Sequence, residues 1–154
     1  MEKKPTDAIE MLKADHQKVT ELFSQYTATN DPQAKRKIAA QVFIELNTHA
    51  QLEETVFYPA FEEEADEEGQ QLVAESLEEH QMVKELIEEL RDLEADDAEF
   101  DAKFHALMEN VQHHVEEEES EMFPQAEEVL EAQMEDLMDE MQELKQQLTS
   151  ANPC

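Results

Sequence analysis

Two segments of the chain place a histidine four residues before a glutamate and end on a proline. "HAQLEETVFYP" (49–59) lies over "HVEEEESEMFP" (114–124) at an offset of 65, which matches His49 with His114 and Glu53 with Glu118. Residues four apart lie on one face of an α-helix, so each pair points an imidazole and a carboxylate at one place. Both groups are common ligands of transition metals.

Two further histidines repeat in the same way. "ADHQKVTELF" (14–23) lies over "EEHQMVKELI" (78–87) at an offset of 64, which matches His16 with His80. All four repeated histidines fall on apolar helical stripes. These stripes are Leu12, Val19 and Phe23 for His16, Val42 and Leu46 for His49, Val73, Leu77, Val83 and Ile87 for His80, and Leu107 and Val111 for His114. We therefore expect all four imidazoles to point inward.

Buried imidazoles and carboxylates need partners, because an unpaired buried polar group costs several kcal/mol. A lone core histidine is usually hydrogen-bonded, and a His–Glu pair arises easily by chance in a glutamate-rich chain. The repeat favours metal ions instead. The sequence predicts a two-metal centre whose terminal ligands are His16, His49, His80 and His114 and whose bridging ligands are Glu53 and Glu118. The other two histidines, His105 and His113, point elsewhere on their helix and are predicted non-ligands.

Apolar residues at helical spacing nearly throughout predict an all-α protein. The first helix is expected from Thr6 or Asp7 to near Tyr26. The second begins at Asp31 and Pro32 and runs toward Asp66, with Pro59 kinking or ending it. Gly69 is expected to mark the turn into a third helix that reaches about Leu93. The fourth is capped by Asp96 or Asp97 and continues to about Met122 or Phe123, before Pro124. Short connections between four long helices predict an antiparallel up-down-up-down bundle.

The C-terminal segment has a different pattern. Its apolar residues are spaced four and three apart, as in a heptad seam: Leu130, Met134, Leu137, Met141, Leu144 and Leu148. This indicates a fifth, amphipathic helix, either laid over the bundle or forming a homodimer through residues 130–148. The predicted organisation is a bundle over 6–125, the heptad helix over 126–149, and a mobile tail over 150–154 that carries the single cysteine, Cys154.

The chain is strongly acidic, with 41 acidic and 11 basic residues and a formal net charge of −30. This charge argues against nucleic acid and anionic membranes as partners and favours cations. A solvated acidic surface accounts for it, and a salt-rich cytoplasm is the alternative. No apolar signal core and no run long enough for a membrane span are present, so we expect a cytoplasmic protein.

The order DHxxV, HxxxE, EHxxV and HxxxE on four helices resembles the hemerythrin family, in particular its HHE cation-binding branch, over about residues 6–125. The resemblance implies an antiparallel four-helix bundle around a non-haem di-iron centre, with the six residues above in the matching places. It also implies two Fe ions, bridged by oxo, hydroxo or water. Ferritin-like bundles also bind two irons, but through an ExxH motif that is absent here.

The chain departs from oxygen-carrying hemerythrins at two points. Those proteins have a second histidine where this chain has Lys84, so one iron would lack a protein ligand, and water or another carboxylate is expected to fill the position. They also end with HxxxxD rather than HxxxE. A register that pairs His113 with Glu118, or His114 with Glu119, would restore the longer spacing, whereas the repeat favours His114 with Glu118.

Three functions are compatible with this site. The resemblance favours a protein that binds O2 or NO for storage, delivery or sensing. The missing histidine favours an enzyme, such as a di-iron oxidase, peroxidase or NO-handling factor. The acidic surface and the heptad segment favour an iron or cation sensor or store. No catalytic residue, nucleotide motif or organic cofactor site is legible, so whether the chain is an enzyme is left open.

Overall fold

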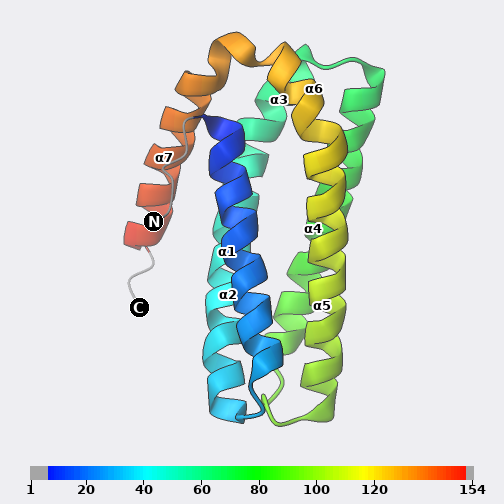
Figure 1. Ribbon diagram of the computed structural model, residues 1–154, viewed down its shortest axis with the longest axis vertical. Coiled ribbons are helices and arrows are strands. Elements are labelled where there is room, and N and C mark those ends of the chain that lie inside the picture. The colour runs from blue at the N-terminus through cyan, green and yellow to red at the C-terminus, as the bar shows by residue number, and fades with distance from the viewer. Residues whose placement is uncertain (1–6, 152–154) are drawn as a thin grey trace.

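The protein is an antiparallel bundle of four long helices with a further helix on its outside (Figure 1). The computed structural model describes residues 7–151, and side chains as far as Thr149. The long helices are α1 (Ala8–Ala28), α2 (Pro32–Leu52), α4 (Glu67–Arg91) and α5 (Ala98–Glu117). The outer helix is α7 (Met134–Ala151). Within the described residues there is no strand, and no helix is long and apolar enough to cross a membrane. The predicted all-α bundle is confirmed.

An aspartate caps the N-terminus of each long helix, and three of these caps were predicted from the sequence. The carboxylates of Asp7, Asp31 and Asp97 each accept a hydrogen bond from a backbone N–H in the first turn of α1, α2 and α5. For α1 the alternative start, Thr6, lies outside the described residues. Asp66 caps α4 in the same way. The short turns that follow reverse the chain, so α1 pairs with α2 and α4 with α5 as two helical hairpins.

Gly69 does not form the turn into α4, contrary to the prediction. It lies inside the first turn of that helix, with no unusual backbone angle. A Cβ at this position would lie 2.5 Å from the Cβ of Ala65 and 3.1 Å from the ring of Phe61. The glycine is therefore required by close packing beneath the helix and not by a turn.

Pro59 and Pro124 do not end their helices. Each follows a single π-helical turn, η1 (Glu53–Phe57) or η2 (Glu118–Met122), and lies in the short helix after it, α3 (Tyr58–Glu64) or α6 (Phe123–Val129). A proline lacks an N–H and clashes with the carbonyl four residues before it, which the wider π turn accommodates. The N–H groups of Tyr58 and Phe123 donate to the carbonyls of Glu53 and Glu118, five residues back.

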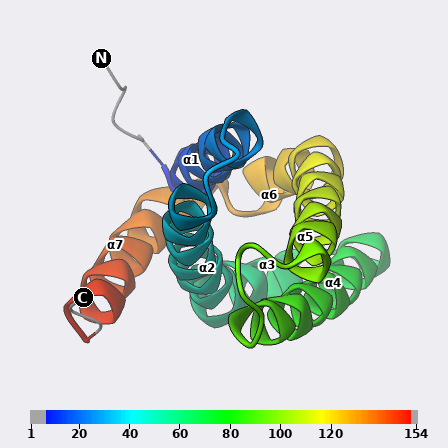
Figure 2. The same cartoon turned by 90° about the horizontal axis from the view of Figure 1, so that it is seen from below.

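The heptad residues pack on the bundle of their own chain. After α6 the chain bends at Leu130, forms a 3-10 turn, η3 (Glu131–Gln133), and continues as α7, which lies outside α1 and α2 (Figure 2). Leu130, Met134, Leu137 and Met141 are buried in the core, so the prediction of a helix laid over the bundle is confirmed. A homodimer through residues 130–148 would require these side chains to leave the core. The predicted tail falls partly on α7, which continues to Ala151, and Cys154 lies outside the described residues.

A polar layer divides the core into two. One apolar cluster surrounds α3, α6 and α7 and includes Leu12, Phe57 and Phe123. The other fills the opposite end of the bundle and includes Phe23 and Phe104. Between them lie the four repeated histidines and Glu53 and Glu118, all at most 8 % exposed.

Candidate metal centre

Each long helix contributes one histidine to this layer, and all four rings turn Nε2 toward the middle of the bundle. Their helices carry them on the apolar faces that the sequence predicts, with one exception. Leu77, expected on the inward stripe of His80, is 43 % exposed, because Ser76 takes the inward position between Val73 and His80. The imidazoles of His80 and of the other three histidines are nonetheless buried.

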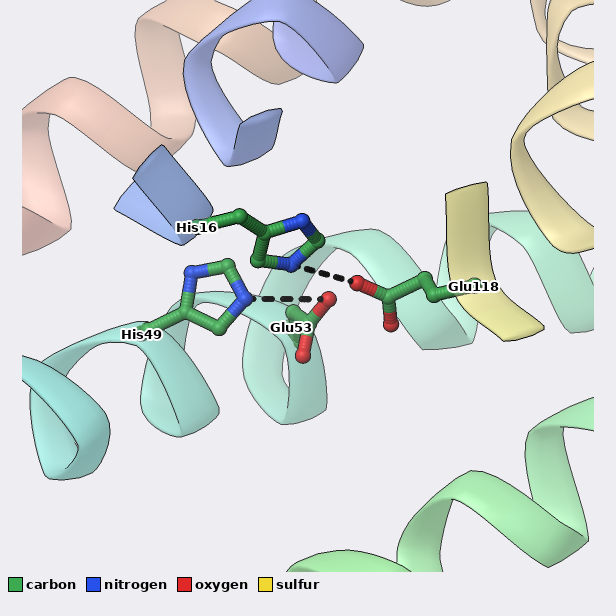
Figure 3. A group of neighbouring side chains, drawn as sticks. All are labelled: His16, His49, Glu53 and Glu118. Carbon is green, nitrogen blue, oxygen red and sulfur yellow. Dashed lines mark ion pairs between the residues drawn. The ribbon is translucent and has the colours of Figure 1, made fainter. Parts of the chain in front are cut away.

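The first group of converging side chains is His16, His49, Glu53 and Glu118 (Figure 3). The Nε2 atom of His16 is 3.0 Å from Oε1 of Glu118, and that of His49 is 3.4 Å from Oε2 of Glu53. Despite these distances, the geometry makes no hydrogen bond, and all four atoms are buried without a partner. Four unpartnered atoms of two imidazoles and two carboxylates, within 4.8 Å of one another, fit a metal ion.

The second group is Glu53, His80 and His114. The Nε2 atom of His80 is 3.0 Å from Oε1 of Glu53, and that of His114 is 3.3 Å from Oε2 of Glu118. Each of the two glutamates therefore turns one oxygen toward each pair of histidines. This is the placement that the sequence predicts for bridging carboxylates, and it joins His114 to Glu118 rather than to Glu119.

Tyr58 lies in the second group, where sequence reasoning did not place it. Its hydroxyl donates to Oε2 of Glu118 at 2.5 Å and lies 3.0 Å from Oε1 of Glu53. The Nε2 atoms of His80 and His114 lie 3.3 and 3.4 Å from the Tyr58 hydroxyl oxygen. The phenol thus lies among the ligand atoms of the second group, whereas Lys84, the residue that replaces the second histidine, pairs with Glu54.

The four histidines are oriented from outside by four carboxylates, which we call the outer carboxylates: Asp15, Glu54, Glu79 and Glu119. The Nδ1 atom of His49 donates to Asp15 at 3.0 Å and that of His114 to Glu79 at 2.6 Å, each within one hairpin. Nδ1 of His16 donates to Glu119 at 2.7 Å, and Nδ1 of His80 to Glu54 at 2.8 Å, each across the two hairpins. A carboxylate at Nδ1 fixes the tautomer that leaves the Nε2 lone pair free for a metal.

Two lysines in turn pair with outer carboxylates. Lys145 of α7 lies 3.2 Å from Asp15, and Lys84 of α4 lies 3.2 Å from Glu54. Lys84 therefore contributes to the surroundings of the centre through Glu54. The outer carboxylates carry a repeat of their own, since Asp15 and Glu79 each precede a histidine and Glu54 and Glu119 each follow a glutamate. That pattern was a sequence signal that could have identified them.

In the metal-free centre the acidic surroundings favour protons on the histidines. Burial opposes a charge on His49, but Glu53 and Asp15 outweigh it and raise its pKa to about 10. Burial likewise opposes ionisation of Glu53, but His49 and the other imidazoles hold the pKa of that carboxyl well below its usual value. Burial, followed by the charges of Glu118 and Glu53, raises the pKa of Tyr58 well above its usual value, so its hydroxyl keeps its proton.

A small cavity lies beside the histidines, on the side away from Tyr58. Its volume is about 40 Å³, and its lining is largely apolar. The walls include Val19, Leu46, Val83 and Val111, each three residues from one of the four histidines and hence one helical turn away. The cavity therefore places a narrow, largely apolar space against the imidazoles.

All six predicted ligands lie together, and the two predicted non-ligands lie apart from them. The side chain of His105 is 53 % exposed and pairs with Asp101, and that of His113 is 67 % exposed and lies near Glu117 and Glu79. Tyr58, the outer carboxylates and the cavity are what the sequence analysis missed at this site.

Comparisons with known proteins agree with the fold and indicate the family. The family model described as the Hemerythrin HHE cation binding domain matches residues 7–126. An uncharacterized hemerythrin-like protein of Schizosaccharomyces pombe is 32 % identical over 81 residues, which cover 53 % of this chain and 40 % of that protein. A DNA nickase of Nostoc is 38 % identical over 50 residues, which cover 32 % of this chain and 14 % of that protein. The chain thus spans less than half the length of either relative.

A solved structure shares the fold. The crystal structure of a hemerythrin HHE cation binding domain-containing protein from Mycobacterium kansasii superposes with a TM-score of 0.80. The match covers 96 % of this chain and 90 % of the other, at 22 % sequence identity. The likeness includes nearly the whole chain and so extends beyond the residues that the family model matches.

Proposed function

This chain belongs to the hemerythrin HHE cation-binding family, and from that premise we propose that it is a non-haem di-iron protein that binds a diatomic ligand, O2 or NO. The observation that carries the proposal is the set of four buried, unpartnered atoms on His16, His49, Glu53 and Glu118. A second set, Glu53 with His80 and His114, would hold a second iron, and Oε2 of Glu118 lies 3.3 Å from Nε2 of His114.

The proposed roles follow from which atoms face the middle of the bundle. His16 and His49 would hold one iron and His80 and His114 the other, while Glu53 and Glu118 would bridge them. Iron in such a site supplies reversible exchange of electrons with a small ligand. The protein's own contribution is to hold four neutral imidazoles with Nε2 free, through the outer carboxylates, and to exclude bulk water with the apolar walls of the cavity.

The size of the cavity supports a diatomic ligand. A single water needs roughly 10–15 Å³ of such volume, so about 40 Å³ admits two or three small atoms and no organic substrate. Besides the histidines, Asp15, Asn47 and Lys84, the walls consist of aliphatic side chains, and most of the lining surface is apolar, which favours a weakly polar ligand over an ion. The same cavity also admits hydrogen peroxide, so size alone does not separate a carrier from an enzyme.

Anaerobic loading with Fe(II) followed by exposure to O2 tests the proposal. We expect two irons per chain and an absorption band that forms with O2 and bleaches under vacuum. An iron-loaded protein that gives no response to O2 or NO would contradict ligand binding and leave iron sensing or storage. His49→Ala or Glu118→Ala should reduce the bound iron, and unchanged iron in both variants would show that the ligands are misassigned.

Tyr58 supports a second candidate function, the turnover of peroxide. Its phenol donates a hydrogen bond to Glu118 at 2.5 Å, inside the buried polar layer. A buried proton donor beside two irons serves a reaction that consumes protons, and simple carriage does not require it.

Tyr58→Phe separates the two functions because it removes only the hydroxyl. If peroxide turnover is the function, Tyr58→Phe should lower its rate by about a hundredfold while the iron content stays at two per chain. The matched control is Phe123→Tyr, which adds a hydroxyl at the equivalent position of the other hairpin. Equal peroxide turnover by the wild type and Tyr58→Phe would remove the support for an enzyme.

A further inference from the structure

The two hairpins are alike around their histidines but differ at the surface. Glu54 and Glu119 occupy equivalent positions and bind Nδ1 of His80 and His16 at nearly equal distances. On one side Lys84 lies against Glu54. The equivalent residue on the other side is Thr20, whose short side chain turns back to the carbonyl of His16. Lys84 thus pairs directly with one outer carboxylate, whereas Lys13 acts on Glu119 only from a longer distance, and Glu119 is the more exposed of the two.

A groove opens on the threonine side, between α1 and the helix formed by α5 and η2. Its volume is about 330 Å³, and it is lined by His16, Gln17, Thr20, Glu21, Val115 and Glu119. The carboxylate-bearing side chain of Glu119 is 38 % exposed, against 24 % for that of Glu54. Two carboxylates therefore line a groove in a protein whose net charge is −30, a combination that concentrates cations.

The groove ends against the buried centre. His16 and Val115 line both the groove and the 40 Å³ cavity, so these two side chains separate one from the other. His16 turns Nδ1 outward to Glu119 and turns its buried, unpartnered Nε2 inward. One ring thus connects an exposed carboxylate to an open ligand position.

We propose that the groove between α1 and α5 is the route by which a divalent metal ion enters the centre, with Glu119 as the first carboxylate to bind it. The inference rests on the proposed function of the buried site. An ion on Glu119 competes with Nδ1 of His16 for the same carboxylate, so binding there frees the ring that closes the passage. Glu118, the next residue back in the π turn, presents an unpartnered oxygen on the inner side and receives the ion.

Uptake of Co(II) by the metal-free protein tests the route without any turnover, because cobalt absorbs visible light once it is coordinated. Glu119→Gln keeps an oxygen that accepts from His16 but removes the charge, and Glu54→Gln makes the same change on the closed side. Both variants should weaken equilibrium binding to a similar extent. Only Glu119→Gln should slow uptake, by about tenfold in stopped-flow mixing, and the difference should shrink at high salt.

Exchanging the two surface residues gives an independent test away from the ligands. Thr20→Lys should slow uptake by about tenfold, whereas Thr20→Met, of similar length but uncharged, should slow it less. Lys84→Thr should leave uptake as fast as in the wild type or faster. Wild-type rates in both Glu119→Gln and Thr20→Lys would overturn the route, and so would equal slowing by Glu119→Gln and Glu54→Gln. A wild-type chain that binds no Co(II) would instead overturn the proposed function.

Discussion

The orientation of each imidazole depends on one outer carboxylate, so these four residues determine how well the centre binds metal. The hydrogen bonds from Nδ1 to these carboxylates are 2.6 to 3.0 Å long. They affect the ligand atom Nε2 only indirectly, through the orientation and basicity of the imidazole ring. Removing such a carboxylate leaves every ligand atom in place. The effect is therefore expected on affinity and not on the number of metal ions at saturation.

Glu79→Gln should weaken metal binding by about 10- to 100-fold, because the amide accepts from His114 less strongly than a carboxylate does. A competition titration against a chelator measures the change. Glu78→Gln, at the exposed neighbouring position, is the control and should bind like the wild type. Equal affinity in the two variants would show that Glu79 does not support His114.

The buried charges also predict how pH affects the metal-free protein. The pKa of His49 is raised to about 10, so its stabilising contribution is complete below its ordinary value near 6.5 and is lost as pH rises toward 10. The pKa of Glu53 is lowered, so its contribution is present above about 4.5 and is lost as pH falls. Together they favour the interval between about pH 4.5 and 6.5.

Urea unfolding with a chelator present should therefore give a lower free energy of unfolding at pH 9 than at pH 6, by more than about 1 kcal/mol. The carboxylates of the surface are ionised at both values, so the difference reports mainly the buried histidines. His49→Gln should show a smaller difference. Equal stability of the wild type at the two pH values would contradict the assignment.

At the scale of single residues, the sequence predicted the six converging side chains because each repeats at a fixed offset. Tyr58 escaped because its position depends on the π turn. Tyr58 lies five residues after Glu53, and on an α-helix this spacing would turn its side chain away from the glutamate. In the π turn the N–H of Tyr58 donates to the carbonyl of Glu53, which places Tyr58 over the glutamate. No local pattern in the sequence predicts that turn before Pro59.

Among the helices, α7 contributes to the core of its own chain and to the surroundings of the centre. Met141 is fully buried against the bundle, and Lys145 pairs with Asp15 one turn further on. Leu144 and Leu148, later in the same heptad seam, are only partly buried. The first half of α7 is thus the part that stabilises the fold.

Met141→Ala should lower the free energy of unfolding by about 2–5 kcal/mol, because it leaves a cavity in the core. Leu148→Ala, on the same seam, should cost much less. Unfolding in urea measures both, and light scattering on the same samples gives the mass. A variant Met141→Ala that changed the mass but not the unfolding midpoint would favour a dimer through α7.

Helix positions were largely predictable because their aspartate caps are local signals, as at Asp7, Asp31 and Asp97. The role of the heptad seam was not, since a seam has the same pattern whether it covers its own bundle or a second copy. Gly69 was misplaced for a similar reason. Its smallness is required by Phe61 of α3 and by Ala65, which ends that helix, and the close approach depends on how α3 and α4 pack, which the sequence pattern does not reveal.

The whole molecule combines a polar layer inside with a large negative charge outside. With 41 acidic and 11 basic residues, mutual repulsion opposes compaction at neutral pH. Salt shortens the range of that repulsion, from about 10 Å at 0.1 M to about 3 Å at 1 M. The stability of the molecule is therefore tied to ionic strength even without any specific ion.

Raising NaCl from 0.1 to 1 M should increase the midpoint of thermal unfolding of the metal-free protein by several degrees at pH 7. The same experiment near pH 4.2, the isoelectric point of the sequence, is the control, because little net charge remains there to screen. An equal rise at both pH values would indicate a general effect of salt on apolar burial. No rise at pH 7 would show that surface repulsion is unimportant.

The likeness of the two hairpins also has a historical consequence. Two copies of one ancestral hairpin, associated about a twofold axis, would already contain four histidines, two glutamates and four outer carboxylates. Duplication and fusion of such a unit would yield this chain without a change at the centre. Positions where the copies now differ, Tyr58 against Phe123 and Lys84 against Thr20, are then the later acquisitions, through which an inherited symmetric site gained two unequal sides.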